Sequence, residues 1–261
     1  MVQTMLRFPL ALQRLLVWLL LIAASASAHA DSVRVAVAAN FAPTLQAIVT
    51  EFEKESGHKL LISAGATGKF YAQIRNGAPF DVLLSADAET PARLIADGAA
   101  VAGSRFTYAL GRLVLWSAQP ELVDRQGALL ARGNFRHLAL ANPKTAPYGA
   151  AAIEVLGNMG LRQSLAPKFV QGENIAQVLQ FVSSGNAELG FVALSQVWKD
   201  GQFTSGSAWL VPPHLHRPIR QDAVLLAAAR DKPAAQALLR YLKGDQARAF
   251  LSAFGYELPP R

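Results

Sequence analysis

Four short turns carry the residue types that are best placed to bind a charged ligand. Each follows an apolar run and precedes a helical pattern, and they read Ala39-Asn40-Phe41, Gly65-Ala66-Thr67-Gly68, Pro147-Tyr148-Gly149 and Glu173-Asn174-Ile175. The first turn of a helix leaves backbone N–H groups unpaired and carries about half a positive charge, so it binds anions without a cationic side chain. Because only Glu173 is charged, the turns favour neutral donors around a small anion. Ordinary helix capping stays open for each turn, since Asn and Thr are common caps.

The second of these turns is similar to the phosphate-binding loop of nucleotide-binding proteins. It continues as Gly65-Ala66-Thr67-Gly68-Lys69. A phosphate-binding loop needs glycine at position 63 and Ser or Thr at position 70. The chain has Ser63 and Phe70 instead. This mismatch argues against nucleotide binding.

Candidates for catalysis and for metal binding are weak. His214 and His216 lie in a proline-rich stretch with no acid or cysteine nearby in sequence, so too few ligands are present for a metal ion. Asp81 and Asp87 flank a predicted strand, where carboxylates more often cap or cross-link. No G-x-S-x-G motif occurs. The sequence has no cysteine, which excludes thiol catalysis, zinc–thiolate sites and iron–sulfur clusters. We therefore expect no catalytic residue, no cofactor and no directly bound metal cation.

The first 30 residues have the layout of a secretory signal peptide. Arg7 and Arg14 precede an apolar run over 15–24, and Ala28-His29-Ala30 provides a small-residue cleavage site. The alternative is a membrane anchor, but the run is short of the roughly 20 residues that span a bilayer. We expect cleavage before Asp31 and export to the periplasm.

The mature chain would have 231 residues, enough for one large or two small domains. The leader contains two arginines and no acidic residue, so the formal net charge of +7 for the full chain becomes +5. These charges are scattered rather than clustered with aromatic residues, which argues against nucleic-acid binding. A mildly positive field helps to recruit an anion.

The elements that must position the four turns alternate between strand and helix patterns. In the first part, strands are predicted over 33–38, 60–62 and 81–85. Leu45, Ile48, Val49 and Phe52 form one helical stripe, and further helices are expected through 70–74 and over 88–96. This βαβαβα order predicts a parallel sheet wrapped by helices.

A second αβ unit follows without an obvious linker. Its predicted strands are 113–116, 138–140, 169–171, 189–193 and 209–211, and helical stripes fall over 153–159 and 175–182. The stretch 121–135 is irregular, and the end of the chain shows a strand over 223–228 and helices over 233–242 and 245–254. We expect two lobes joined by crossings at 109–117 and 221–229. The first lobe would comprise residues 31–112 and 222–261, and the second lobe would comprise residues 113–221.

The sequence resembles the periplasmic molybdate-binding proteins of ABC transporters over essentially the whole mature chain. The segments that carry the resemblance are VAVAANFAP (35–43), SAGATGKFYAQI (63–74), NGAPFDVLLSAD (76–87), ANPKTAPYG (141–149) and GFVALSQ (190–196). The resemblance implies an α/β, two-lobed periplasmic binding protein fold of type II, each lobe a mainly parallel sheet flanked by helices. It also implies molybdate or tungstate as the ligand, an ABC transporter permease as the partner, and a monomer.

The resemblance assigns site residues position by position. Asn40 stands where the family has Ser or Asn, and Thr67 stands where the family usually has Ser. Tyr148 stands where a backbone N–H, and in this branch also the phenol, contacts the anion. Ile175 stands where an apolar residue donates its backbone N–H. Two positions depart from the pattern. Ala39 replaces a Thr of some members and Ala193 replaces a Tyr, so both lack the hydroxyl.

Three other functions stay open at this point. A receptor for another tetrahedral oxyanion, such as sulfate, would use the same donors. A periplasmic hydrolase would need a nucleophile and a base in the cleft, which the four turns do not supply. A sensor without a transport role is the third alternative, and the sequence does not separate molybdate from tungstate.

Overall fold

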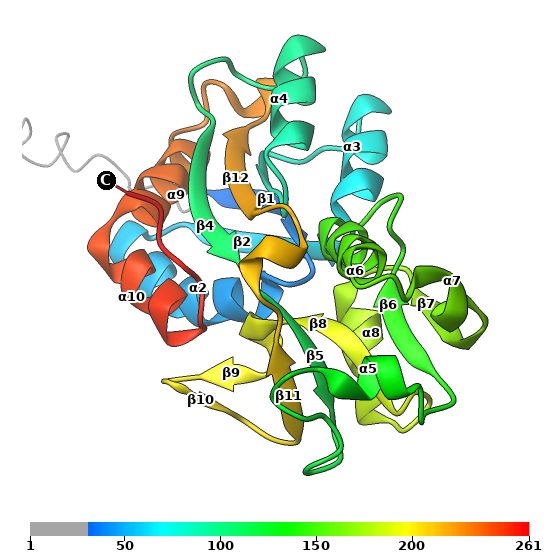
Figure 1. Ribbon diagram of the computed structural model, residues 1–261. Coiled ribbons are helices and arrows are strands. Elements are labelled where there is room, and N and C mark those ends of the chain that lie inside the picture. Colours follow the sequence, from blue (N-terminus) through cyan, green and yellow to red (C-terminus); the bar gives the residue numbers. More distant parts are fainter. Residues whose placement is uncertain (1–30, 261) are drawn as a thin grey trace, which may run out of the picture. The chain divides into compact units, whose positions relative to one another are not determined.

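The computed structural model describes residues 31–260, and the predicted signal peptide lies outside this range. In the described part, the longer strands form two five-stranded sheets, each covered by helices (Figure 1). None of the helices in this range is long and apolar enough to cross a membrane.

The first sheet has the strand order β2-β1-β3-β12-β4. Its strands are β1 (Ser32–Ala38), β2 (Lys59–Gly65), β3 (Val82–Leu84), β4 (Phe106–Gly111) and β12 (Ile219–Leu225). Strands β2, β1 and β3 run parallel, while β12 is antiparallel to both of its neighbours. The helices of this lobe are α2 (Ala42–Ser56), α3 (Thr67–Arg75), α4 (Glu89–Ala96), α9 (Pro233–Lys243) and α10 (Asp245–Ala253).

Both faces of this sheet are buried, which explains the apolar, β-branched run of β1. Val35 and Val37 pack in one cluster with α2, α9 and α10. Ala36 points to the other face and packs in a cluster with α3 and α4. The expected helical stripe is confirmed in α2, where Leu45 and Ile48 are fully buried.

The second sheet has the strand order β11-β5-β8-β6-β7. Its strands are β5 (Leu113–Ser117), β6 (Leu138–Ala141), β7 (Phe169–Gly172), β8 (Leu189–Ala193) and β11 (Ser207–Leu210). Helices α5 (Ala128–Arg132), α6 (Pro147–Asn158), α7 (Arg162–Leu165) and α8 (Ile175–Ser183) belong to this lobe, together with a small hairpin of β9 (Trp198–Lys199) and β10 (Gln202–Phe203). Short 3-10 helices cover Ala166–Lys168, Leu194–Gln196, Pro213–Leu215 and Ala227–Ala229.

The sheets are mixed rather than mainly parallel. In the second sheet β6 is parallel to β7 and β8, but β5 is antiparallel to β8 and β11. The antiparallel strands are those that carry the chain between lobes. It passes from β4 to β5 at Arg112, and from β11 to β12 over 211–218, earlier than the expected 221–229. A strand that enters from the opposite lobe runs against the βαβ strands, which explains the reversal.

Candidate anion-binding site

The four predicted turns meet at one small cavity. Residues of all four line it, and the full lining is Ala38, Ala39, Asn40, Gly65, Ala66, Thr67, Ala86, Ala146, Pro147, Tyr148, Asn174 and Ile175. Among these described residues no side chain is charged. The cavity volume is about 10 Å³, on the scale of the roughly 10–15 Å³ that one water needs. At this volume the cavity holds no more than one water molecule, so a larger ligand requires the surrounding turns to move apart.

Strand and helix ends of both lobes form this cavity. Strands β1 and β2 end at Ala38 and Gly65, and strands β6 and β7 end at Ala141 and Gly172. Helices begin a few residues after each end, which is where ligands bind in open α/β sheets. Pro147 opens α6, because its fixed φ suits the first helical turn and it has no N–H to satisfy.

Three helix starts direct unpaired N–H groups to this region. Thr67 and Ile175 are the first residues of α3 and α8, and Tyr148 is the second residue of α6. Within residues 31–260 none of these three N–H groups has a hydrogen-bond acceptor. The following N–H groups are occupied: Gly68 donates to Thr145 over 2.9 Å, and Ala176 to the Asn174 side chain over 2.9 Å.

Asn40 directs its backbone and its side chain to different partners. Its N–H also lacks an acceptor in the described range. Its side-chain Nδ2 donates to Gln221 Oε1 over 2.9 Å and to the Tyr256 hydroxyl over 3.1 Å. Both amide protons are therefore used inside the protein, which leaves the backbone N–H as the donor that Asn40 offers to a ligand.

Thr67 is held so that its hydroxyl proton stays available. Its Oγ1 accepts a hydrogen bond from the Ala86 N–H over 3.1 Å, and the residue is buried. Because that bond uses an oxygen lone pair, the hydroxyl proton is free to donate. Thr67 thus offers two donors, its N–H and its O–H.

Tyr148 lies with its phenol buried against the lobe crossing. Its hydroxyl oxygen accepts from Gln221 Nε2 over 3.0 Å, and the residue is 2% exposed. Burial and the neighbouring Tyr256 raise the pKa of the phenol well above 10, although the bond to Gln221 lowers it in part. The hydroxyl is therefore neutral at physiological pH.

Of the two positions that depart from the family pattern, Ala39 lies at the cavity and Ala193 does not. Ala39 lines the cavity, but its N–H donates to the Gly65 carbonyl over 2.9 Å. Ala193 is fully buried, donates its N–H to Gln196 Oε1 over 3.0 Å, and is not among the lining residues. Neither alanine has a free N–H to give.

A buried polar network behind the cavity was not foreseen from the sequence. Tyr256 donates to Ser195 Oγ over 3.0 Å, and Ser195 donates to the Asn40 carbonyl over 3.1 Å. The Tyr108 hydroxyl lies 3.0 Å from Gln221 Oε1. The sequence offered no signal for it, because Gln221 stands between Arg220 and Asp222, before the strand predicted over 223–228.

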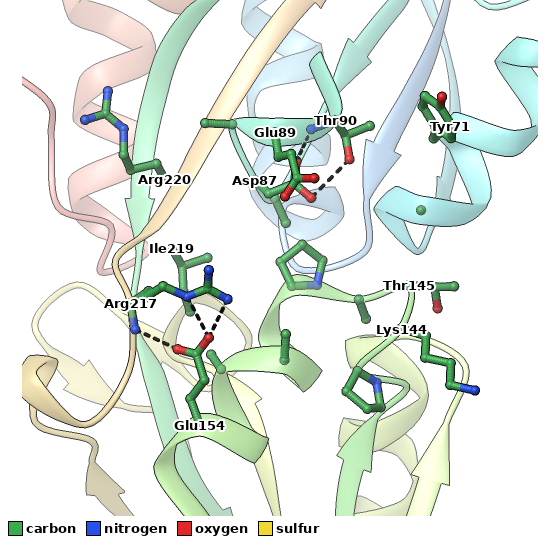
Figure 2. Close-up of a pocket in the computed structure, with 18 of the residues that line it drawn as sticks. Tyr71, Asp87, Glu89, Thr90, Lys144, Thr145, Glu154, Arg217, Ile219 and Arg220 are labelled. Carbon is green, nitrogen blue, oxygen red and sulfur yellow. Dashed lines mark hydrogen bonds and ion pairs between the residues drawn. The ribbon is translucent and has the colours of Figure 1, made fainter. Parts of the chain in front are cut away.

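A wider cleft, shown in Figure 2, shares the lining residues Ala86, Ala146 and Pro147 with the cavity. Its volume is about 490 Å³. Four cationic and three anionic residues line it: Arg93, Lys144, Arg217, Arg220, Asp87, Glu89 and Glu154. Figure 2 shows Arg217 paired with Glu154, with 2.6 Å between Nη2 and Oε1. The charges thus lie in the cleft, while the cavity keeps neutral donors.

The other sequence candidates have structural roles. The Asp81 carboxylate accepts from the Arg34 N–H over 2.7 Å and pairs with Lys232 over 2.9 Å. Asp87 accepts from the Thr90 N–H at the start of α4 over 2.7 Å. In the range 31–260, His214 and His216 belong to no group of acids, histidines and cysteines that could hold a metal ion.

Comparisons with known proteins show which family the chain is similar to. Residues 33–257 match the family model of the bacterial extracellular solute-binding proteins. The chain is 59% identical over 232 residues to the molybdate-binding protein ModA of Azotobacter vinelandii, covering 89% of this chain and 92% of that protein. It is 48% identical over 230 residues to ModA of Rhodobacter capsulatus, covering 88% and 89%.

Solved structures support the same fold. The periplasmic molybdate-binding protein of Azotobacter vinelandii superposes with a TM-score of 0.85 and 43% identity, covering 87% of this chain and all of that chain. The sulfate-binding protein SubI of Mycobacterium tuberculosis gives a TM-score of 0.68 at 14% identity, covering 87% of each chain. That second likeness concerns the fold alone.

Proposed function

This chain belongs to the bacterial extracellular solute-binding protein family, and on that premise we propose that it captures molybdate in the small cavity and delivers it to an ABC transporter permease. The observation that carries the proposal is the set of unpaired N–H groups of Asn40, Thr67, Tyr148 and Ile175 around a cavity without charged side chains. The names of the two relatives, both molybdate-binding proteins, select the anion. The relatives are binding proteins and not enzymes, and this chain is likewise a binding protein.

Binding by neutral donors accounts for strong capture without a cation. A hydrogen bond to a charged group contributes about 1.5–3 kcal/mol. Four N–H groups and the Thr67 hydroxyl would together replace the hydration shell of a dianion. After the costs of association and closure, several such bonds are sufficient for sub-micromolar affinity.

Capture would proceed by closure of the two lobes. Asn40 and Thr67 come from the lobe of the first sheet, while Tyr148 and Ile175 come from the second. In an open state each lobe would offer half of the donors, and the anion would bring the halves together. The cationic surplus of the cleft would attract the anion toward the cavity. The closed form would then be read by the permease.

Selectivity would follow from protonation and size. Around the cavity the available backbone groups are donors, so a fully deprotonated oxyanion is matched. Hydrogen phosphate carries a proton that needs an acceptor, and sulfate is smaller than molybdate. Tungstate has nearly the size and charge of molybdate, so we propose that it binds as well.

Calorimetric titration of the purified chain 31–261 tests this function. We expect tight binding of molybdate and tungstate, weaker binding of sulfate and thiosulfate, and the weakest binding of phosphate. A clear response to sulfate without a response to molybdate would reject the proposal. A sulfate-binding protein would then be the better-supported function.

Export and assembly are part of the same proposal. We propose that residues 1–30 are removed on export and that the mature protein begins at Asp31. We further propose that it acts as a monomer, with one lobe formed by 31–112 and 219–261 and the other by 113–218, so that the limit expected at 221/222 moves to the start of β12. Intact-mass measurement of the periplasmic fraction and light scattering after size-exclusion chromatography test the first two statements. A mass that retains the leader, or a stable dimer, would contradict them.

A further inference from the structure

Gln221 joins residues of both lobes behind the cavity. It lies on β12, is 0% exposed, and is not among the lining residues. Its Oε1 lies 2.9 Å from Asn40 Nδ2 and 3.0 Å from the Tyr108 hydroxyl, both in the first lobe. Its Nε2 lies 3.0 Å from the Tyr148 hydroxyl, in the second lobe.

This arrangement determines which way the Tyr148 hydroxyl donates. Gln221 Oε1 accepts a hydrogen bond from Asn40 Nδ2. The Tyr108 hydroxyl, which has one proton, lies 3.0 Å from both this oxygen and the Ser85 carbonyl oxygen. The amide nitrogen of Gln221 therefore faces the Tyr148 oxygen and donates to it. The proton of that phenol cannot return to Gln221, and it has no other acceptor among residues 31–260. Tyr148 lines the cavity, and we infer that its hydroxyl proton is directed there.

Gly111 provides independent support for the contact. A Cβ at this position would lie 2.1 Å from the Tyr148 hydroxyl oxygen and 2.6 Å from Gln221 Nε2. The φ angle of Gly111 is not in the left-handed region, so the backbone does not require glycine there. The missing side chain is explained by the space that the Tyr148–Gln221 pair occupies at the lobe crossing.

The same amide also fixes the first turn of the site. Asn40 donates its two amide protons to Gln221 and Tyr256. The turn before α2 is thereby held from behind, with its backbone N–H left unpaired. One buried side chain thus acts on a donor group from each lobe.

We propose that Gln221 is a positioning residue that sets the Tyr148 hydroxyl as a donor to the bound oxyanion, so that the site selects fully deprotonated anions over protonated ones. This inference rests on the proposed function. If the Gln221 amide were lost, the Tyr148 oxygen would be free to accept from a protonated oxyanion. Gln221 would therefore act on selectivity through Tyr148, without touching the ligand.

A double-mutant cycle on molybdate affinity tests the inference. The variants are Gln221→Met, Tyr148→Phe and the double variant, titrated by calorimetry at pH 7. We expect each single variant to weaken binding by about 10-fold to 100-fold, the range of one hydrogen bond to a charged group. We expect the double variant to lose less affinity than the product of the two single losses, because with the phenol gone only the contact of Gln221 with Asn40 remains to be lost. Independent, multiplying losses would overturn the inference, as would unchanged affinity in Gln221→Met.

The selectivity between molybdate and phosphate is a second measurement, and a purely structural role of Gln221 would not change it. We expect the ratio of molybdate to phosphate affinity to fall by at least about 10-fold in Gln221→Met, because the phenol becomes able to accept. Ser117→Ala is the control, since it removes a part-buried hydrogen bond to the Glu188 carbonyl in the second lobe and should leave the ratio unchanged. An equal fall of the ratio in Ser117→Ala would assign the effect to general destabilisation and reject the inference.

Two further arms keep the test decisive. If Gln221→Met does not fold, Gln221→Asn keeps an amide that is one carbon shorter, and its coupling to Tyr148→Phe is read in the same way. The wild-type titration separates the two proposals. Absence of molybdate binding by the wild type rejects the proposed function, whereas wild-type binding without coupling rejects only the role of Gln221.

Discussion

The N–H of Gly68 donates to the carbonyl oxygen of Thr145 over 2.9 Å, and this bond joins the two lobes next to the cavity. Gly68 lies in the first turn of α3, and Thr145 lies in the segment that leads into α6. Their approach is close enough that a Cβ on Gly68 would lie 3.0 Å from Thr145 Cα. The close approach of the two backbones therefore favours glycine at position 68.

Gly68→Ala should weaken anion binding while the lobes remain folded. The added methyl group meets backbone atoms of Thr145, and relief requires the lobes to separate slightly. Overpacking of this kind costs about 1–3 kcal/mol, so we expect the molybdate Kd to rise by about 5-fold to 150-fold. Calorimetry and thermal unfolding measure the two properties. Gly157→Ala is the control, because its Cβ meets open space on α6, and an equal loss there would contradict the explanation.

Thr67 should contribute through its hydroxyl as well as its N–H. In Thr67→Val the Ala86 N–H loses its acceptor, which costs about 1–3 kcal/mol of unfolding free energy. Loss of the O–H donor should also weaken molybdate binding by about 10-fold or more. Thr67→Ser keeps both functions and should bind within a few-fold of the wild type. If Val and Ser variants bind equally well, the hydroxyl is not a ligand donor.

The ion pair between Lys69 and Glu173 also crosses between the lobes, and we expect it to matter little. Both side chains are about half exposed, at 50% and 56%. Exposed pairs contribute about 0–1 kcal/mol and are screened by salt. Lys69→Met should therefore weaken molybdate binding by less than about 5-fold, with the difference vanishing at high salt.

Lys59→Met is the matched control for Lys69→Met. It removes an exposed pair with Glu53 that lies within the first lobe, at 2.6 Å. Titrations at low and high salt compare the two variants. A larger loss in Lys69→Met that persists in high salt would show that the pair holds the closed state by more than screened attraction.

Helices and strands whose apolar residues recur with a regular period could be predicted from the sequence. The β-branched run of β1 and the apolar stripe of α2 have the burial that their patterns predicted. The four turns were also foreseeable, because each combines a strand end with a helix start. Their convergence on one cavity follows from the order of strands in the sheets. Short elements such as α5 and the β9–β10 hairpin have too few residues to display a period, and the sequence reading missed them.

The hydrogen-bond network around Gln221 could not be predicted from local sequence patterns. Asn40 and Gln221 are 181 positions apart in the chain, and their contact depends on the pairing of β12 with β3 and β4. That pairing is antiparallel, although the alternating pattern favoured parallel strands. The partner of a buried amide becomes known only when the lobe crossings are placed in space.

Tyr256 should make stability fall at alkaline pH. Burial raises the pKa of its phenol to about 12, even though hydrogen bonds with Ser195 and Asn40 partly lower it. The folded state thus holds this proton more tightly than the unfolded state, whose phenol titrates near 10. The contribution is fully present below about pH 10 and is lost as pH rises to about 12.

Urea unfolding at pH 8, 10 and 11.5 measures this loss. The rise of the Tyr256 pKa from 10 to about 12 sets an upper limit of about 3 kcal/mol for this residue, and the slope per proton is about 1.4 kcal/mol per pH unit. Tyr256→Phe should start from a lower stability at pH 8, because Ser195 and Asn40 lose a partner. It should then lose less stability between pH 10 and 11.5 than the wild type. Tyr108 and Tyr148 have raised pKa values too, so a residual slope is expected. An identical slope in both proteins would show that the Tyr256 phenol keeps its ordinary titration in the folded state.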